Sequence, residues 1–164
     1  MELCNEIVIR GLLERHGFRF SRSMGQNFLI DPSIPAAIAE ASGADEGCGV
    51  LEIGPGIGPL TAELAKRAGK VVSIELDRAL LPVLAETVGD LPNVEIVPGD
   101  ALRLDLEGLI AEKFQGLTPM VCANLPYNIT TPVLTKLAGI PSLTALTVLT
   151  QKEAAQRFTA PQGS

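Results

Sequence analysis

The sequence predicts an α/β fold, in which a parallel β-sheet is flanked by helices, and three observations support this prediction. Short apolar runs alternate with stretches of helical periodicity along the whole chain. One of these runs, residues 50–53, ends in glycines at alternate positions, Gly54, Gly56 and Gly58, before Pro59 opens a helical pattern. The first four runs end in residue types that can contact a ligand: Gly54, Glu75, Asp100 and Asn124. Because parallel strands joined by right-handed crossovers present their carboxyl ends together, we expect these residues at one edge of the sheet.

The size and composition of the chain fit one globular domain. Of its 164 residues, 46% are hydrophobic and 20% are charged. A chain of this length buries roughly 70% of the surface that its unfolded form exposes. No apolar run reaches the roughly 18 residues of a membrane-spanning helix, and residues 1–10 lack the apolar core of a signal peptide. We therefore expect a cytoplasmic protein without membrane association.

Charge and reactive side chains narrow the function. The formal net charge of −6 argues against a protein that holds nucleic acid mainly by its phosphates, and basic residues are concentrated only in residues 1–24. The three cysteines form no CxxC pair, which favours reduced thiols over disulfides or a zinc site: Cys4, Cys48 and Cys122. The single histidine, His16, argues against a Ser-His-Asp triad. We expect no metal site.

Residues 1–30 are expected to form an N-terminal arm or lid beside a domain of residues 31–164. Apolar residues at helical spacing predict a weakly amphipathic helix over residues 2–14, which Gly17 can end. Residues 18–29 have no clear period and concentrate aromatic, basic and amide side chains. They are interpreted either as an ordered functional arm or as an extension held in the core by two phenylalanines.

The remaining elements follow from the hydrophobic period and from helix signals. Asp31 can cap a helix and Pro32 suits its first turn, so a helix is predicted over residues 31–42, with a loop over 42–49. Pro82 is expected in the first turns of its helix. Further helices are predicted over residues 60–68, 76–88, 106–114, 131–137 and 151–158. Strands are predicted over residues 50–53, 70–74, 94–97, 119–123 and 143–149.

The glycine turn predicts a seat for a nucleotide-like ligand. Glycines permit positive φ and a close approach to the main chain, and the following helix offers unpaired amides and the positive end of its dipole. A plain strand-to-helix turn is the alternative.

Two acids follow the next two predicted strands. Glu75 follows Gly54 by 21 residues, about where a dinucleotide fold places the acid that binds ribose hydroxyls; a solvated carboxylate is the alternative. Asp100 can accept a hydrogen bond from an adenine amine or cap the next helix.

Residues 124–127 indicate chemistry at an aromatic amine. Methyl transfer to such an amine requires that its lone pair turn out of the ring and toward the donor carbon. The Asn124 side-chain oxygen and the Leu125 backbone carbonyl can accept the two amine hydrogens. Pro126 fixes the turn that aims this carbonyl, and Tyr127 offers a face on which the base stacks. Such stacking contributes roughly 1–3 kcal/mol per base, whereas a plain Pro-Tyr turn at a strand end is the alternative.

This reaction requires no general base, because the methylated ammonium is acidic enough to lose its proton to water. Catalysis then consists of positioning and charge arrangement, which suits a chain without a histidine cluster or a metal motif. The sequence fits a dehydrogenase, which transfers hydride, less well. The usual dinucleotide loop reads GxGxxG, whereas here Pro59 follows the third glycine, and no proton donor is evident.

Five motifs in chain order resemble those of the ribosomal RNA adenine dimethyltransferases: Gly25-Gln26-Asn27-Phe28-Leu29, Leu51-Glu52-Ile53-Gly54-Pro55-Gly56-Ile57-Gly58, Ile74-Glu75-Leu76-Asp77, Gly99-Asp100-Ala101-Leu102 and Asn124-Leu125-Pro126-Tyr127-Asn128-Ile129. That family uses S-adenosylmethionine to place two methyl groups on the exocyclic amine of adenines near the end of small-subunit (16S) rRNA. The resemblance therefore implies a Rossmann-like methyltransferase fold, S-adenosylmethionine as cofactor, and small-subunit rRNA in a pre-ribosomal particle as partner.

The resemblance also implies roles for individual residues. Gly54 would lie under the methionine part of the cofactor, Glu75 would hold its ribose, and Asp100 its adenine. The implied cofactor-binding residues are Gln26, Asn27, Leu29, Gly54, Gly56, Glu75, Leu76, Asp100, Ala101 and Asn124. The implied catalytic residues are Asn124, Leu125, Pro126 and Tyr127. Asn124 would serve both the cofactor and the target amine, and the arm would cover the cofactor.

Two departures from the family pattern leave alternatives open. Arg22 stands where the family commonly has lysine, which keeps the charge. The chain stops at Ser164, before the family's last strands and helical domain, so we expect an incomplete catalytic domain whose fifth strand has an exposed apolar edge. One alternative is a binding module of the same fold without turnover. Another is a large-subunit rRNA adenine methyltransferase, although Leu125 and the Glu-Ile-Gly-Pro-Gly run favour the small-subunit branch.

Overall fold

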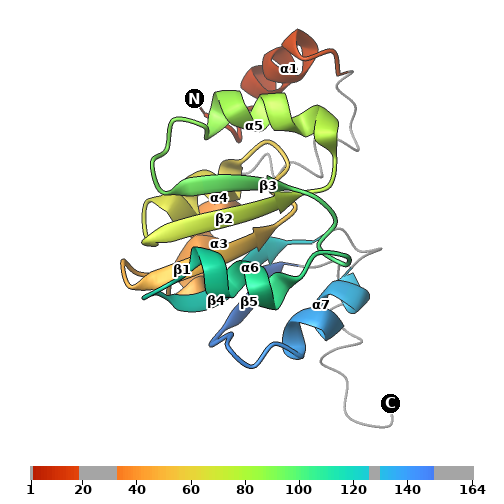
Figure 1. Cartoon of the computed structure of the whole chain (residues 1–164). Coiled ribbons are helices and arrows are strands. Elements are labelled where there is room, and N and C mark those ends of the chain that lie inside the picture. The colour runs from red at the N-terminus through yellow and green to blue at the C-terminus, as the bar shows by residue number, and fades with distance from the viewer. Residues whose placement is uncertain (1, 19–32, 126–129, 150–164) are drawn as a thin grey trace, which may run out of the picture.

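The structure, a computed structural model, describes residues 2–18, 33–125 and 130–149 and contains a five-stranded sheet between layers of helices (Figure 1). In chain order the strands are β1 (Cys48–Ile53), β2 (Lys70–Glu75), β3 (Val94–Pro98), β4 (Thr118–Asn124) and β5 (Leu146–Leu149). Their order across the sheet is β3-β2-β1-β4-β5, and all neighbouring strands are parallel. The predicted α/β fold is confirmed.

Helices cover both faces of the sheet, so its central strands are buried on both sides. The described helices are α1 (Glu6–Arg15), α3 (Ser33–Ser42), α4 (Pro59–Ala65), the short 3-10 helix η1 (Arg78–Leu80), α5 (Leu81–Thr87), α6 (Leu106–Lys113) and α7 (Thr130–Ala138). Helices α3 and α4 pack on one face, and α6 and α7 pack on the other (Figure 1). This arrangement explains why the strands read as nearly continuous apolar runs.

Strand β1 shows how the two layers share one strand. Val50 points into the cluster that holds Ile38 of α3 and Leu60 of α4. Its neighbour Leu51 points to the other face, into the cluster that holds Ile110 of α6. Successive side chains of a strand alternate between faces, so a strand of six residues joins both hydrophobic cores.

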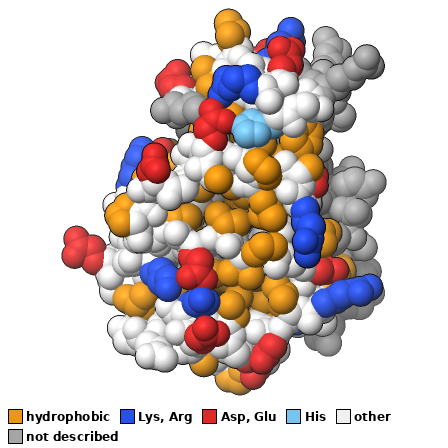
Figure 2. Space-filling model, turned by 45° about the horizontal axis from the view of Figure 1, so that its top comes forward, with side chains coloured by type: hydrophobic (Ala, Val, Ile, Leu, Met, Phe, Trp, Pro, Cys, Tyr) orange, Lys and Arg blue, Asp and Glu red, His pale blue; other side chains and the backbone are white. Residues whose placement is uncertain are grey.

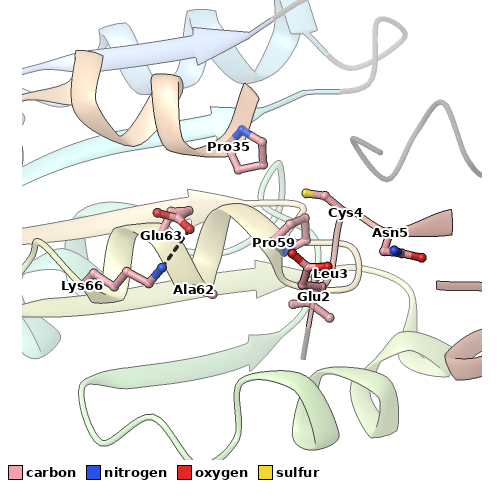
Figure 3. A pocket seen from close by; sticks show the side chains of 9 residues that line it. All are labelled: Glu2, Leu3, Cys4, Asn5, Pro35, Pro59, Ala62, Glu63 and Lys66. Atoms are coloured by element: carbon pink, nitrogen blue, oxygen red, sulfur yellow. Dashed lines mark hydrogen bonds and ion pairs between the residues drawn. The ribbon is translucent and has the colours of Figure 1, made fainter. Parts of the chain in front are cut away.

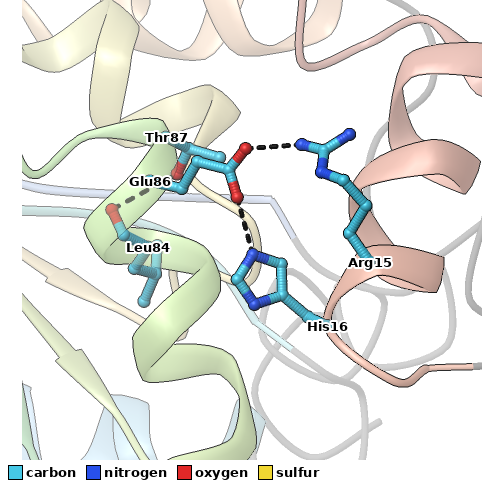
Figure 4. Close-up of polar contacts among 5 residues, drawn as sticks. All are labelled: Arg15, His16, Leu84, Glu86 and Thr87. Atoms are coloured by element: carbon cyan, nitrogen blue, oxygen red, sulfur yellow. Dashed lines mark hydrogen bonds and ion pairs between the residues drawn. The ribbon is translucent and has the colours of Figure 1, made fainter.

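Helix α1 packs beside α5 and forms a third hydrophobic cluster with it (Figure 1). Leu12 and Leu13 of α1 are fully buried in this cluster, together with Val83 of α5. Arg15 and His16 both reach the carboxylate of Glu86 on α5, and the distance from His16 Nε2 to Glu86 Oε2 is 2.6 Å (Figure 4). These polar contacts reinforce an apolar interface.

Several predicted element ends shift because of local capping. The first helix begins at Glu6 instead of residue 2, since Asn5 Oδ1 accepts hydrogen bonds from the amides of Ile7 and Val8. The helix predicted over residues 76–88 begins only at Arg78, as the 3-10 helix η1, because Asp77 caps that turn. Pro82 lies in the first turn of α5, as predicted.

Three further ends also differ from the prediction. Strand β1 already begins at Cys48, within the predicted loop, because it pairs there with β4. Helix α4 ends at Ala65 instead of residue 68, and the Asn93 side-chain amide donates to the freed Ala65 carbonyl. Strand β5 begins at Leu146 instead of residue 143, since residues 141 and 142 form a turn and the regular register with β4 starts only at Leu146. The helix predicted over residues 151–158 lies outside the described residues.

Candidate functional site

The carboxyl ends of the first four strands meet around the point where strand order reverses. Strand β1 is central, β2 and β3 lie on one side of it, and β4 and β5 lie on the other. Gly54 follows β1, Glu75 ends β2, Asp100 follows β3 by two residues, and Asn124 ends β4. The Gly54 amide donates to the Ile74 carbonyl at 2.9 Å, which continues the ladder into the turn. In open parallel sheets, ligands bind in the crevice at this position.

The glycine turn has the conformation that its sequence requires. The φ angles are 72° at Gly54, 63° at Gly56 and 100° at Gly58, a region that side chains other than glycine rarely adopt. Pro59 then opens α4. A Cβ built on Gly54 would meet no atom of the described residues within 4 Å, so these residues leave the space next to it open to a ligand.

Glu75 is fixed at the rim of the sheet by backbone amides. Its side chain is almost fully buried, with 6% of the residue exposed. Oε1 accepts from the Gly56 amide at 3.1 Å, and Oε2 accepts from the Asp77 amide at 2.9 Å. Burial raises the pKa of the Glu75 carboxyl above its usual range, and these hydrogen bonds oppose the shift. Since each oxygen has a further lone pair, the carboxylate can also accept from two hydroxyls of a ligand.

The turns after β2 and β3 combine apolar and polar groups. Leu76 is 64% exposed directly after Glu75, whereas Ala101 is buried. Asp100 Oδ1 accepts from the Leu102 amide at 2.9 Å and so stabilises its own turn. The alternative in which Asp100 caps the next helix is wrong, because Asp105 caps α6 through the Gly108 amide.

Two consecutive residues at the end of β4 differ in exposure: the Asn124 side chain is partly accessible, whereas the Leu125 side chain is buried in the core. Asn124 is partly exposed at the end of the strand and pairs with β5. The Leu125 side chain is 3% exposed and belongs to the cluster beneath α6 and α7, so this residue can contact a ligand only through its backbone. The remaining predicted residues lie outside the described part of the chain: Gln26, Asn27, Leu29, Pro126 and Tyr127.

A second buried glutamate, Glu52 in β1, was not predicted as a site residue. Its Oε1 accepts from the hydroxyls of Ser73, at 2.7 Å, and Thr61. Burial raises the pKa of Glu52 to about 7, against the opposing effect of these hydroxyls. An acid inside an apolar strand is the sequence signal for such a group, but its partners lie 9 and 21 residues away.

A cavity of about 550 Å³ lies between the N-terminal segment, α3 and α4, and its lining reaches Pro59, which directly follows the glycine turn (Figure 3). Its walls include Asn5, Pro35 and the ion pair of Glu63 with Lys66. Gly54, Glu75 and the other strand-end residues do not line it. The cavity and the strand-end site are therefore different features.

Charge on the described surface is mixed. Figure 2 shows Lys and Arg side chains scattered among Asp and Glu on one face, without a single basic patch there. Within the described ranges, no group of three His, Cys, Asp or Glu side chains is arranged to hold a metal ion. Among the same residues, no helix combines the length and hydrophobicity that crossing a membrane requires.

Comparison with known proteins identifies relatives over nearly the whole chain. The family model for ribosomal RNA adenine dimethylase matches residues 17–164. The ribosomal RNA small subunit methyltransferase A of Shouchella clausii is 50% identical over 156 residues, which cover 93% of this chain and 52% of that protein. The chain spans about half the length of such curated relatives.

Solved structures share the fold. The 23S rRNA methyltransferase ErmE superposes with a TM-score of 0.65 at 33% identity, over 77% of this chain and 48% of that one. A dimethyladenosine transferase from Plasmodium falciparum gives the same TM-score at 28% identity, over 82% of this chain and 46% of that one. Both comparisons agree with the sheet and the flanking helices described above.

Proposed function

This chain belongs to the ribosomal RNA adenine dimethylase family, and on that premise we propose that it carries the catalytic domain of an S-adenosylmethionine-dependent dimethyltransferase for adenines of small-subunit rRNA. One observation carries the proposal: four candidate ligand-binding residues lie at or just after the carboxyl ends of four neighbouring strands, around one switch point. The small-subunit branch is favoured because curated relatives that are 45–50% identical over 93–99% of this chain are named small-subunit methyltransferases. The substrate would be met in a pre-ribosomal particle in the cytoplasm.

The geometry of the turns supports S-adenosylmethionine as the cofactor. The open space at Gly54 suits its methionine part, and the free lone pairs of Glu75 suit the two ribose hydroxyls. Exposed Leu76 offers an apolar surface for the adenine ring. The Gly99 amide donates to the Glu75 carbonyl at 3.0 Å, which joins the turn of Asp100 to the end of β2. The predicted contacts of Gln26, Asn27 and Leu29, from an arm that covers the cofactor, complete the proposal.

The proposed mechanism relies on orientation of the target amine. When bound, S-adenosylmethionine supplies an electrophilic methyl group. The Asn124 side-chain oxygen and the Leu125 carbonyl would accept the amine hydrogens, which turns the nitrogen lone pair away from the ring. Pro126 would hold this turn, and Tyr127 would stack on the base. Transfer to the nitrogen would break the methyl carbon–sulfur bond of the donor and leave S-adenosylhomocysteine. The methylated nitrogen would then lose its proton to water, so no side chain need act as a base.

The test is methylation of small-subunit particles that lack the modification. With methyl-labelled S-adenosylmethionine, we expect dimethyladenosine in small-subunit rRNA and none in large-subunit rRNA, measured by mass spectrometry of the digested RNA. Asn124→Ala should lower transfer by roughly 100-fold or more, as loss of one preorganised polar group does in other sites. Its affinity for S-adenosylhomocysteine, measured by titration calorimetry, should stay within about 3-fold because Glu75 and the glycine turn are unchanged.

A matched control is Gln115→Ala, which removes an exposed amide between α6 and β4, at the opposite edge of the sheet. It should transfer methyl groups like the original chain. Unchanged turnover in Asn124→Ala would show that another group orients the amine. Cofactor binding without any transfer by the original chain would favour the binding module, whereas binding of NAD in place of S-adenosylhomocysteine would contradict the proposal.

A further inference from the structure

Lys136 of α7 donates its ammonium group to the turn that follows β3. Its Nζ lies 2.7 Å from the Ala101 carbonyl oxygen and 2.6 Å from the Leu104 carbonyl oxygen. The lysine is 35 residues from Ala101 in sequence, and the side chain is half-buried between the two elements. Within the described residues, no carboxylate forms an ion pair with this ammonium. Two of its three donors are therefore committed to backbone carbonyls of a single turn.

Within the turn, Asp100 is the acceptor of the hydrogen bonds, so the carbonyls of Ala101 and Leu104 can accept from a donor outside the turn. The Asp100 side chain accepts from the Leu102 amide, and the Asp100 carbonyl accepts from the amides of Arg103 and Leu104. The carbonyls of Ala101 and Leu104 are the acceptors that Lys136 serves. Asp100 therefore stabilises the turn through hydrogen bonds within it, and Lys136 of α7 stabilises it through hydrogen bonds to two of its carbonyls.

Packing brings the same helix against the turn. Val133 lies about one helical turn before Lys136, and Leu137 directly follows it; both are buried in one hydrophobic cluster with Ala101. Leu125, at the end of β4, belongs to this cluster as well. Helix α7 begins at Thr130, shortly after that residue. One helix therefore contacts the turn that carries Asp100 and Ala101 and also follows the strand end that carries Asn124.

We propose that Lys136 is a positioning residue that fixes the turn of residues 100–104 for the adenine of the cofactor. The proposal rests on the proposed function, since it assumes S-adenosylmethionine as the ligand of this turn. Lysine suits the task because a compact ammonium can serve two convergent carbonyls, whereas its aliphatic stem packs on apolar neighbours. Removing the ammonium frees the turn to shift, and adenine then has to order it upon binding.

The test compares Lys136→Met with Lys136→Arg by titration calorimetry. Methionine keeps the apolar stem without the donors, and arginine keeps the charge. We expect the Kd for S-adenosylhomocysteine to rise about 10-fold in Lys136→Met and no more than about 3-fold in Lys136→Arg. The Kd for 5′-methylthioadenosine, which lacks the amino-acid part, should rise by the same factor, because the defect concerns the adenosine end.

Lys113→Met is the matched control, since Lys113 ends α6 at the other edge of the sheet and pairs with Glu95 at 2.8 Å. It should leave both affinities unchanged. If Lys136→Met is folded by circular dichroism and binds both ligands within about 2-fold of the original chain, the inference is overturned. A folded Lys136→Arg variant that loses about 10-fold in affinity would overturn it too, even where Lys136→Met fails to fold. Failure of the original chain to bind S-adenosylhomocysteine would instead overturn the proposed function.

Discussion

Glu52 and Glu75 lie on adjacent strands and are both almost fully buried, but they differ in their partners. Glu52 stands opposite Ser73 in the register of β1 and β2, and it accepts from side-chain hydroxyls of β2 and α4. Glu75 accepts from the backbone amides of Gly56 and Asp77. Burial raises the pKa of both carboxyls.

The difference in partners separates a structural acid from one that can bind a ligand. The hydroxyls that meet at Glu52 come from two other elements, so this carboxyl ties the first helix after the glycine turn to the sheet. The amides at Glu75 belong to the turns at the edge of the site, so they hold the carboxylate in place and leave lone pairs for a ligand. We therefore expect stability to depend on Glu52 and cofactor affinity to depend on Glu75.

The largest expected effect is the pH dependence of stability that Glu52 produces. Its pKa is about 7 in the folded chain, whereas an exposed glutamate has a pKa of 4.5. Between these values the folded state binds a proton that the unfolded state releases. The contribution of the group is therefore complete below pH 4.5 and is lost as pH rises to about 7. The loss amounts to about 3 kcal/mol of unfolding free energy.

Glu52→Gln should remove this dependence, because glutamine stays neutral and keeps an oxygen acceptor for the two hydroxyls. Urea unfolding at about pH 5 and about pH 8, followed by circular dichroism, measures the change. The variant should gain stability relative to the original chain as pH rises. Glu46→Gln, an exposed acid before β1, is the control and should keep the original dependence. If the unfolding free energies of Glu52→Gln and the original chain change equally between these pH values, Glu52 is not the source of the pH dependence.

The second effect concerns affinity. In Glu75→Gln one carboxylate oxygen becomes an amide nitrogen, which cannot accept from the Asp77 or Gly56 amide or from a ribose hydroxyl. The Kd for S-adenosylhomocysteine should rise roughly 30-fold, about 2 kcal/mol. Since protonation turns one acceptor oxygen into an O–H donor, the Kd of the original chain should also rise as pH falls through the raised pKa of Glu75. Calorimetry at several pH values measures both effects.

Glu52→Gln is the matched control for Glu75→Gln, because it also replaces a carboxylate oxygen of a buried glutamate with an amide nitrogen, on the adjacent strand. At about pH 6 its Kd should stay within about 3-fold of the original value, since Glu52 contacts hydroxyls inside the protein. Equal losses of affinity in both variants would contradict the assignment of cofactor binding to Glu75 and of a structural role to Glu52. Retained affinity in Glu75→Gln would assign the ribose to another group.

The fold was predictable because its signals are local. Apolar runs, helix periodicity and the glycine turn each depend on neighbours in sequence, and together they imply the parallel sheet that the structure contains. Element ends were less predictable. The first helix starts late because a single Asn5 side chain serves two amides, which competes with the apolar pattern of residues 2–5.

The site was predictable only where residues lie at strand ends. Glu75 and Asn124 were placed at one edge by topology alone, because parallel strands share a direction. Lys136 gave no such signal, since its acceptors are backbone carbonyls 32 and 35 residues away that any residue type provides. The partners of Glu52 were hidden for a similar reason: serine and threonine hydroxyls occur throughout the chain.

The smallest expected effect is a change in Tm on substitution of a third glutamate, Glu86, which lies at the surface. Here the contacts with His16 and Arg15 lower the pKa of the carboxyl, the opposite direction from both buried acids. Its contribution to stability is therefore present above pH 4.5 and is lost as pH falls through the lowered pKa. Because the pair is exposed and α1 also packs through buried leucines, Glu86→Gln should lower the Tm by no more than about 2 °C at about pH 7.

Thermal unfolding at neutral pH in low salt and in about 1 M salt measures this effect. Salt should reduce the difference between Glu86→Gln and the original chain, since the Debye length falls to about 3 Å at that concentration. Glu63→Gln, which breaks the exposed pair with Lys66 at the end of α4, is the control and should not change the Tm measurably. A salt-resistant loss in Glu86→Gln would mean that the docking of α1 depends on this carboxylate as the sheet depends on Glu52.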